Sequence, residues 1–245
     1  MPRFFVDPEA ISDGEIIIAG DDARHIARSL RMAVGDEITV CDGSGKEYLT
    51  RLVRIRDEEC TARIDLVTES RAEPGCRVTL YMAYPKGDKL ETVIQKSVEL
   101  GASEIVPFES ERCIKRPAPE KAEKQTARLE RIAHEAAKQC GRAVLPIVER
   151  PISFTSLTER IPSHALVLLC YEREGANTIR HTLEALSAPP ADIAVIVGSE
   201  GGFSEGEAKS LAEAGAVCVN LGPRILRCET APDYALSVIS CFLEL

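Results

Sequence analysis

Apolar and polar positions follow two different patterns along this chain of 245 residues, and one pattern gives way to the other near residue 72. Before it, short apolar runs are separated by polar turns, and residues 49–56 alternate in part, which is typical of strands in a small barrel. After a Pro-Gly linker at residues 70–75, apolar runs alternate with helical patterns, which predicts an open α/β sheet. We therefore expect two domains, 1–72 and 73–245. The strands expected in the first are 15–18, 37–41, 47–56 and 60–67.

One helix is expected to interrupt the N-terminal strands. Asp21 or Asp22 can cap its start, and a glycine follows its end. Arg24, Arg28 and Arg31 are spaced i, i+4 and i+7, so a helix would carry them on one face. Their spacing fits a solvated charged surface as well as a basic binding site.

The second domain shows five apolar runs separated by helical patterns. Ser204 with Glu207, and Asp88 with Glu91, have the spacing of capping boxes and predict helix starts. The expected strands are 77–84, 104–108, 165–170, 193–197 and 217–221, and the expected helices are 88–100, 121–140, 179–186, 204–214 and 233–245.

Two of these strands end in loops rich in glycine and charge. Residues 193–197 are continuously apolar, as expected of a strand buried on both faces, and lead into Gly198, Gly201 and Gly202. The strand 217–221 leads into a Gly-Pro turn that carries two arginines and a glutamate. Glycine lets backbone approach a ligand closely, and ends of buried strands rarely need so many charges for packing alone. The pattern predicts a small-molecule site at the carboxyl edge of the sheet.

Familiar nucleotide motifs do not explain this site. The glycine spacing is not G-x-G-x-x-G, and no G-x-x-x-x-G-K-[ST] occurs. Residues 43–46 resemble only a fragment of the second motif and are interpreted as a hairpin turn.

The nine cysteines include no C-x-x-C pair, so we expect reduced thiols and no metal. The net charge is −9, and residues 1–72 hold 10 basic and 15 acidic residues, which argues against a non-specific nucleic-acid coat. No apolar run approaches membrane-spanning length and no signal-peptide pattern occurs, so we expect a cytoplasmic protein.

Two segments carry a family resemblance. Val-Gly-Ser-Glu-Gly-Gly-Phe-Ser at 197–204 and Leu-Gly-Pro-Arg-Ile-Leu-Arg-Cys-Glu-Thr-Ala at 221–231 resemble the ribosomal RNA small subunit methyltransferase E family of the SPOUT superfamily. The resemblance extends over nearly the whole chain, through residues 86–91, 95–96, 99–101, 110–113 and 139–142. Ser199 departs from it, because the family usually has proline there.

The resemblance implies an N-terminal PUA-like β-barrel, a C-terminal α/β domain with a deep trefoil knot, and a homodimer. It implies methyl transfer from S-adenosylmethionine to N3 of a uridine in small-subunit ribosomal RNA. Arg227 would be the electrostatic catalyst, while Glu200 and Glu229 are candidate bases or orient an arginine. The implied cofactor contacts are Leu169, Cys170, Tyr171, Glu172, Gly198, Glu200, Gly201, Gly202, Leu221, Gly222, Ile225, Leu226 and Arg227. The implied RNA contacts are Arg3, Arg24, His25, Arg28, Arg31 and Arg112.

Three rival interpretations remain open from the residues. A transfer-RNA methyltransferase of the same fold would lack a reason for the N-terminal arginine face. A non-enzymatic RNA-binding module would not need the glycine loop with Glu200 and Arg227. A glycine-loop hydrolase is the third alternative, and it would need a Ser or Cys nucleophile in an elbow motif.

Overall fold

The computed structural model describes residues 1–114, 119–172 and 176–244. The chain divides into two compact units. Unit 1 comprises Met1–Glu73 and Ala137–Leu145, and unit 2 comprises Pro74–Ala136 and Pro146–Leu245. The expected division into 1–72 and 73–245 did not assign residues 137–145 to the first unit, whereas the structure does.

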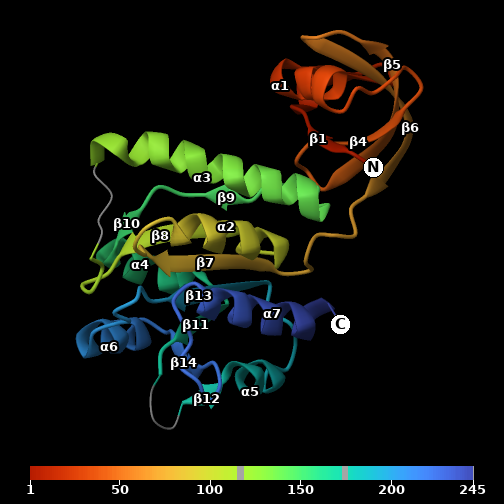
Figure 1. The fold of residues 1–245 in the computed structure, drawn as a ribbon. Helices are drawn as coiled ribbons and strands as arrows, with labels where there is room; N and C mark the ends of the chain where they lie inside the picture. Colours follow the sequence, from red (N-terminus) through yellow and green to blue (C-terminus); the bar gives the residue numbers. More distant parts are fainter. Residues whose placement is uncertain (115–118, 173–175, 245) are drawn as a thin grey trace. The chain divides into compact units, whose positions relative to one another are not determined.

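Unit 1 is built on a curled six-stranded sheet that forms a half-barrel (Figure 1). Its pairs are antiparallel except β1 with β4, which are parallel. The register between β5 and β6 shifts twice, and such bulges bend a sheet. Ile16 and Ile18 on β3 point into the core while their neighbours are exposed, as the alternation predicts. The strands, in sheet order, are β1 Arg3–Phe5, β4 Glu37–Cys41, β5 Lys46–Ile55, β6 Glu59–Glu69, β3 Glu15–Ala19 and β2 Ile11–Ser12.

The expected helix of unit 1 forms, but its ends differ from the prediction. It comprises α1 (Gly20–Arg24) and a π-helical turn, η2 (His25–Ser29). The prediction that Asp21 or Asp22 caps it is wrong, because the cap is Ala19 and has no side-chain bond. Asp22 instead accepts a hydrogen bond of 3.0 Å from Lys138. Arg31 lies beyond the helix with a φ of +50°, so it does not continue the helical face that carries Arg28.

Residues 137–145 are held to unit 1 by a buried arginine. Only 3% of the Arg142 side chain is exposed, and its guanidinium lies 2.8 Å from a Glu73 carboxylate oxygen. The other oxygen of Glu73 accepts hydrogen bonds from the backbone amides of Ala143 and Val144 at 2.8 and 3.0 Å. This single carboxylate fixes the chain where it leaves α3 (Pro119–Cys140).

Unit 2 is organised around a parallel eight-stranded sheet, in which β9 pairs with β8 outside the main path. The strands on that path, in order, are β10 Ile152–Ser153, β8 Glu104–Glu109, β7 Arg77–Ala83, β13 Asp192–Val197, β11 Leu166–Cys170, β14 Val217–Asn220 and β12 Asn177–Thr178. β9 is Ile147–Val148. The central strand β13 is buried from Ile193 to Val197, which explains its continuous apolar run.

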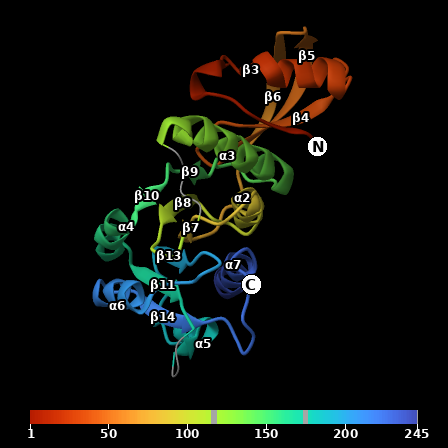
Figure 2. The ribbon, with the colours of Figure 1, turned by 60° about the vertical axis from the view of Figure 1, so that its left-hand side comes forward.

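Helices cover both faces of this sheet. Figure 2 shows α2 (Lys89–Glu99), α5 (Ile179–Glu184) and α7 (Thr230–Glu244) on one side, and α4 (Phe154–Arg160) and α6 (Glu205–Glu213) on the other. The capping box at Ser204 is confirmed, since its hydroxyl accepts from the Glu207 amide and the Glu207 carboxylate accepts from the Ser204 amide. The box expected at Asp88 is wrong, because its side chain makes no cap bond and only its carbonyl accepts from the Glu91 amide. Leu245, expected in the last helix, lies outside the described residues.

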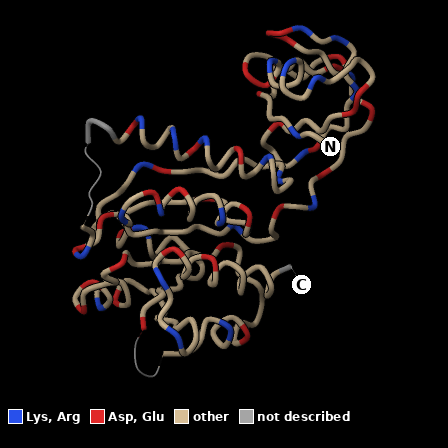
Figure 3. Tube along the Cα trace, viewed as in Figure 1, with Lys and Arg blue, Asp and Glu red and all other residues tan. Residues whose placement is uncertain are grey.

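Charge is mixed along both units. In Figure 3, Lys and Arg alternate with Asp and Glu on most elements rather than gathering on one segment. No helix of the described residues is long and apolar enough to cross a membrane. The described part of the chain also contains no cluster of three or more His, Cys, Asp or Glu side chains able to hold a metal ion.

Candidate active site

Three loops at the carboxyl ends of β11, β13 and β14 meet at one cavity of about 740 Å³. The three strands are neighbours in the sheet, so their loops lie side by side, and the volume is typical of sites that bind small molecules. All the expected cofactor contacts line it except Leu169, which is fully buried within β11. The lining comprises Lys89, Arg112, Cys170–Glu172, Val197–Phe203, Glu205, Val219–Gly222, Arg224–Glu229 and Ala231.

The loop after β13 is a tight glycine turn. The Gly202 amide donates to the Ser199 carbonyl at 2.9 Å, and Gly202 has a φ of +63°. A Cβ at Gly198 would lie 3.1 Å from the Cα of Gly202, and one at Gly201 would lie 2.9 Å from the Cβ of Arg112. These positions require glycine because a side chain would push the turn apart.

Phe203 fastens this turn to its neighbours. Its ring is buried and stacks on Phe108 at 6.3 Å, while Tyr171 from the loop after β11 meets it edge-on at 6.4 Å. The buried Glu207 carboxylate accepts from the Ser204 amide at 3.0 Å and from the Glu111 amide at 2.7 Å. The turn, the start of α6 and the loop after β8 are thereby held together.

A lysine from α2 joins two of the pocket loops. Lys89 Nζ lies 3.1 Å from Glu200 in the glycine turn and 3.0 Å from Glu229, just before α7. The three side chains are 32%, 28% and 25% exposed, so solvent reaches them only in part. The Lys86 amide also donates to Glu200 at 3.2 Å, and Cys228 Sγ donates to Glu229 at 3.2 Å.

These contacts set the protonation states of the cluster. Burial opposes ionisation of Glu200, but backbone amides and the Lys89 ammonium outweigh it and lower the pKa of that carboxyl. Burial likewise opposes ionisation of Glu229, and hydrogen bonds again lower its pKa. Burial raises the pKa of the Cys228 thiol to about 12, so this thiol is neutral at pH 7. A carboxylate with a lowered pKa is a weak proton acceptor, so the arrangement favours orientation of Lys89 over a role as base.

Two arginines reach the pocket from the loop after β14. Arg224 and Arg227 are exposed, and neither guanidinium has an ion pair or hydrogen bond among the described residues. The backbone of Arg227 is fixed, because its carbonyl accepts from the amides of Thr230 and Ala231 at 2.8 and 3.0 Å. An anchored backbone with an unpaired cation suits stabilisation of negative charge in the cavity.

The expected RNA contacts occupy four different settings. Arg3 is 14% exposed and pairs with Glu47 at 3.1 Å, which leaves little of its guanidinium for a phosphate. Arg24 pairs with Asp21, and Arg28 with Asp57, on the surface of unit 1.

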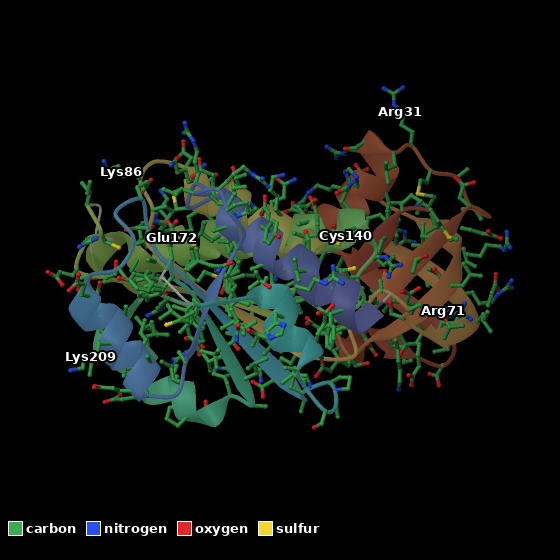
Figure 4. The ribbon with its side chains drawn as sticks, turned by 90° about the horizontal axis from the view of Figure 1, so that it is seen from below. Arg31, Arg71, Lys86, Cys140, Glu172 and Lys209 are labelled. Carbon is green, nitrogen blue, oxygen red and sulfur yellow. The ribbon has the colours of Figure 1, made fainter. Side chains whose placement is uncertain are left out.

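His25 and Arg31 are exposed without an ion pair in the described part of unit 1, and Arg31 points away from the ribbon in Figure 4. Arg112 lies in unit 2 and donates to the Gly201 carbonyl at 3.0 Å. Arg112 therefore belongs to a different unit from the other five expected RNA contacts.

Lys89 is the site residue that the sequence analysis missed. It belongs to the segment Lys86-Gly87-Asp88-Lys89 that carried the family resemblance, but nothing in its spacing links it to residues more than 100 positions away. Ser199 is a second such residue. This residue lines the cavity, and its buried hydroxyl has no hydrogen-bond partner within the described residues.

The cavity fits S-adenosylmethionine in chemistry as well as size. The ligand has amino, carboxylate, ribose and adenine groups that can bind backbone amides and carbonyls, and two of the three loops that line the cavity contribute glycines. The unpartnered Ser199 hydroxyl offers one further polar atom.

Comparison with known proteins agrees with this fold and site. An RNA methyltransferase domain family matches residues 72–240, and an RNA methyltransferase PUA domain family matches residues 18–65. A ribosomal RNA small subunit methyltransferase E of Bacillus subtilis is 34% identical over 251 residues, covering 100% of this chain and 98% of the relative.

Two solved structures are similar over almost their whole length. One is a ribosomal RNA small subunit methyltransferase E from Neisseria gonorrhoeae bound to S-adenosylmethionine, with a TM-score of 0.86, 34% identity, and 98% of this chain and 97% of that chain covered. The other is a Legionella pneumophila methyltransferase in complex with the same cofactor, with a TM-score of 0.84, 31% identity, and 98% and 96% covered.

The half-barrel of unit 1 and the parallel sheet of unit 2, with its glycine-lined cavity, define an RNA methyltransferase that carries a PUA domain. The chain belongs to the ribosomal RNA small subunit methyltransferase E family. The expected family and the expected two-part fold are confirmed, and the expected cofactor is the molecule bound in both solved relatives. The trefoil knot stays a prediction.

Proposed function

We propose that the protein methylates N3 of a uridine in small-subunit (16S) ribosomal RNA, with S-adenosylmethionine as the methyl donor. One observation carries the proposal above all. The cavity at the ends of β11, β13 and β14 is lined by 12 of the 13 expected cofactor contacts, in a fold that matches a cofactor-bound family member over nearly its full length.

The bound cofactor supplies an electrophilic methyl group, so the protein must position the uridine and manage its N3 proton. Loss of that proton leaves an imide anion, and the unpaired guanidinium of Arg227 stabilises it from the cavity wall. Glu200 and Glu229 both form ion pairs with Lys89, so we assign these carboxylates to positioning Lys89 rather than to proton transfer. The proton then passes to solvent or to an RNA group rather than to either carboxylate.

The target base must be accessible before it can react. N3 of a stacked, paired uridine faces its partner, so the base is single-stranded or flipped into the cavity. Basic side chains of unit 1, foremost Arg31, contact phosphates of the same RNA. A small-subunit substrate places the protein in the cytoplasm, where ribosomal subunits assemble.

Nucleoside analysis of ribosomal RNA tests the proposal. A strain that lacks the gene should lose one N3-methyluridine from its small-subunit RNA, and wild-type protein should restore it. Unchanged small-subunit RNA, with a methyl group missing from transfer RNA instead, would replace this proposal with the transfer-RNA alternative.

We also propose that the protein acts as a homodimer through α7. Tyr234 and Phe242 on this helix are 39% and 37% exposed, which is high for large aromatic side chains. Light scattering should give twice the chain mass for wild type and a monomer for Phe242→Glu. A monomeric wild-type protein with full activity would contradict the dimer.

A further inference from the structure

We propose that Lys89 is a positioning residue that holds the glycine turn and the loop before α7 together by neutralising two facing carboxylates. The proposal rests on the proposed function, because it names the part that this cross-link has in cofactor binding. Lys89 itself comes from neither loop, since it is the first residue of α2.

The two carboxylates that Lys89 contacts lie close to each other. Glu200 and Glu229 each lie about 3 Å from the same Nζ atom, so their carboxylates lie within about 6 Å of each other. Both residues line the cavity, and they come from two different loops. Two carboxylates at this separation repel each other unless a cation lies between them, or unless one of them takes up a proton.

The other groups that contact Glu200 and Glu229 are uncharged. The Lys86 amide and the Cys228 thiol complete the contacts of the two carboxylates, and neither carries charge. Lys89 is therefore the only cation that touches both carboxylates among the described residues. The other charged side chains that line the cavity are Arg112, Glu172, Glu205, Arg224 and Arg227.

Removal of Lys89 would change the interaction between the two carboxylates. In Lys89→Met the two carboxylates face each other without a cation, so the loops separate or one carboxyl is protonated with a raised pKa. A raised pKa favours the closed arrangement at low pH, and that stabilisation is lost as the pH rises through the new pKa. Wild type lacks this dependence above pH 6, because both pKa values are lowered.

The experiment compares wild type, Lys89→Met, the double variant Lys89→Met with Glu229→Gln, and Lys96→Met. Lys96 is the matched control, because it lies on the same helix and pairs with Asp233 at 3.9 Å, and it does not line the cavity. Each protein is titrated with S-adenosylhomocysteine from pH 6 to 9, and each affinity is divided by that of wild type at the same pH. Thermal midpoints without ligand are recorded over the same range.

We expect Lys89→Met to bind about tenfold more weakly at pH 8, equivalent to about one pKa unit, and to approach wild type at pH 6. Its thermal midpoint should show the same recovery at low pH. The double variant should regain most of the affinity at pH 8, since the repulsion is gone, and Lys96→Met should match wild type.

Two results would overturn the inference. Wild-type affinity in Lys89→Met at every pH would show that the cross-link positions nothing. A pH-independent loss that Glu229→Gln does not restore would make Lys89 a direct ligand contact. Failure of wild type itself to bind S-adenosylhomocysteine would instead refute the proposed function, while the thermal midpoints would still report on the carboxylate pair.

Discussion

Arg112 Nη1 donates a hydrogen bond of 3.0 Å to the carbonyl oxygen of Gly201, so the loop after β8 closes on the glycine turn after β13. The contact is tight, since the missing Cβ of Gly201 would lie 2.9 Å from the Cβ of Arg112. An arginine expected to contact RNA thus forms part of the wall of the cavity at the ends of β11, β13 and β14.

Gly201→Ala should therefore weaken cofactor binding. Overpacking of this kind costs about 1–3 kcal/mol, so we expect a loss of about tenfold or more in affinity for S-adenosylhomocysteine, measured by calorimetry. Gly206→Ala is the matched control, because a Cβ there would approach nothing closer than 3.9 Å. Equal affinities for the two variants would contradict this account of the turn.

The capping box at the start of α6 predicts a stability effect. Ser204→Ala removes the acceptor for the Glu207 amide, so the free energy of unfolding in urea should fall by about 1 kcal/mol. Ser210→Ala changes an exposed serine on the same helix and should alter it by less than about 0.5 kcal/mol. A loss in Ser210→Ala as large as that in Ser204→Ala would show that the effect is not specific to the cap.

The sequence predicted the elements with strong periodicity and the loops with unusual composition. The buried run at 193–197 and the capping box at Ser204 have local causes, so they were predicted where the structure has them. The two- and three-residue strands were missed because so short a segment shows no period. The helix cap at Ala19 was missed because Asp22 is drawn away by Lys138, a tertiary contact that no local pattern contains.

The candidate site also contains residues that local sequence predicts and residues that only tertiary contacts bring together. Glycine and charge composition placed the loops that line the cavity, because those residues are contiguous in sequence. The role of Lys89 was not predictable, since it depends on the fold bringing α2 beside Glu200 and Glu229. The surroundings of Arg3 were not predictable either, because no local pattern indicates that this residue pairs with Glu47 and is mostly buried.

Arg31 should contribute most to RNA binding among the arginines of unit 1. Arg24 and Arg28 must first give up Asp21 and Asp57, whereas Arg31 has no such partner among the described residues. Arg31→Gln should weaken affinity for small-subunit RNA and lower the slope of log affinity against log salt by about one.

Arg71→Gln is the control for this measurement, since Arg71 is also exposed and lies toward the other side of unit 1 in Figure 4. Equal losses in the two variants would show that only net charge matters. No loss in Arg31→Gln would leave this arginine as solvated surface.

Arg227→Ala should separate rate from binding. If the guanidinium stabilises the N3 anion, kcat should fall about 100-fold while affinities for RNA and S-adenosylhomocysteine change little. Raising the pH should restore part of the rate, because hydroxide then helps remove the N3 proton. Arg224→Ala, in the same loop, should retain most of its rate. A loss of binding in proportion to rate would make Arg227 a positioning residue.

Methyl transfer by the purified protein is the decisive measurement of the proposed activity. Small ribosomal subunits from the deletion strain are incubated with wild-type protein and S-adenosylmethionine labelled in its methyl group, and the RNA is digested for mass spectrometry. We expect one labelled methyl group per subunit, found as N3-methyluridine, and labelling about 100-fold slower with Arg227→Ala. Label on another base, or on no RNA at all, would contradict the proposed activity.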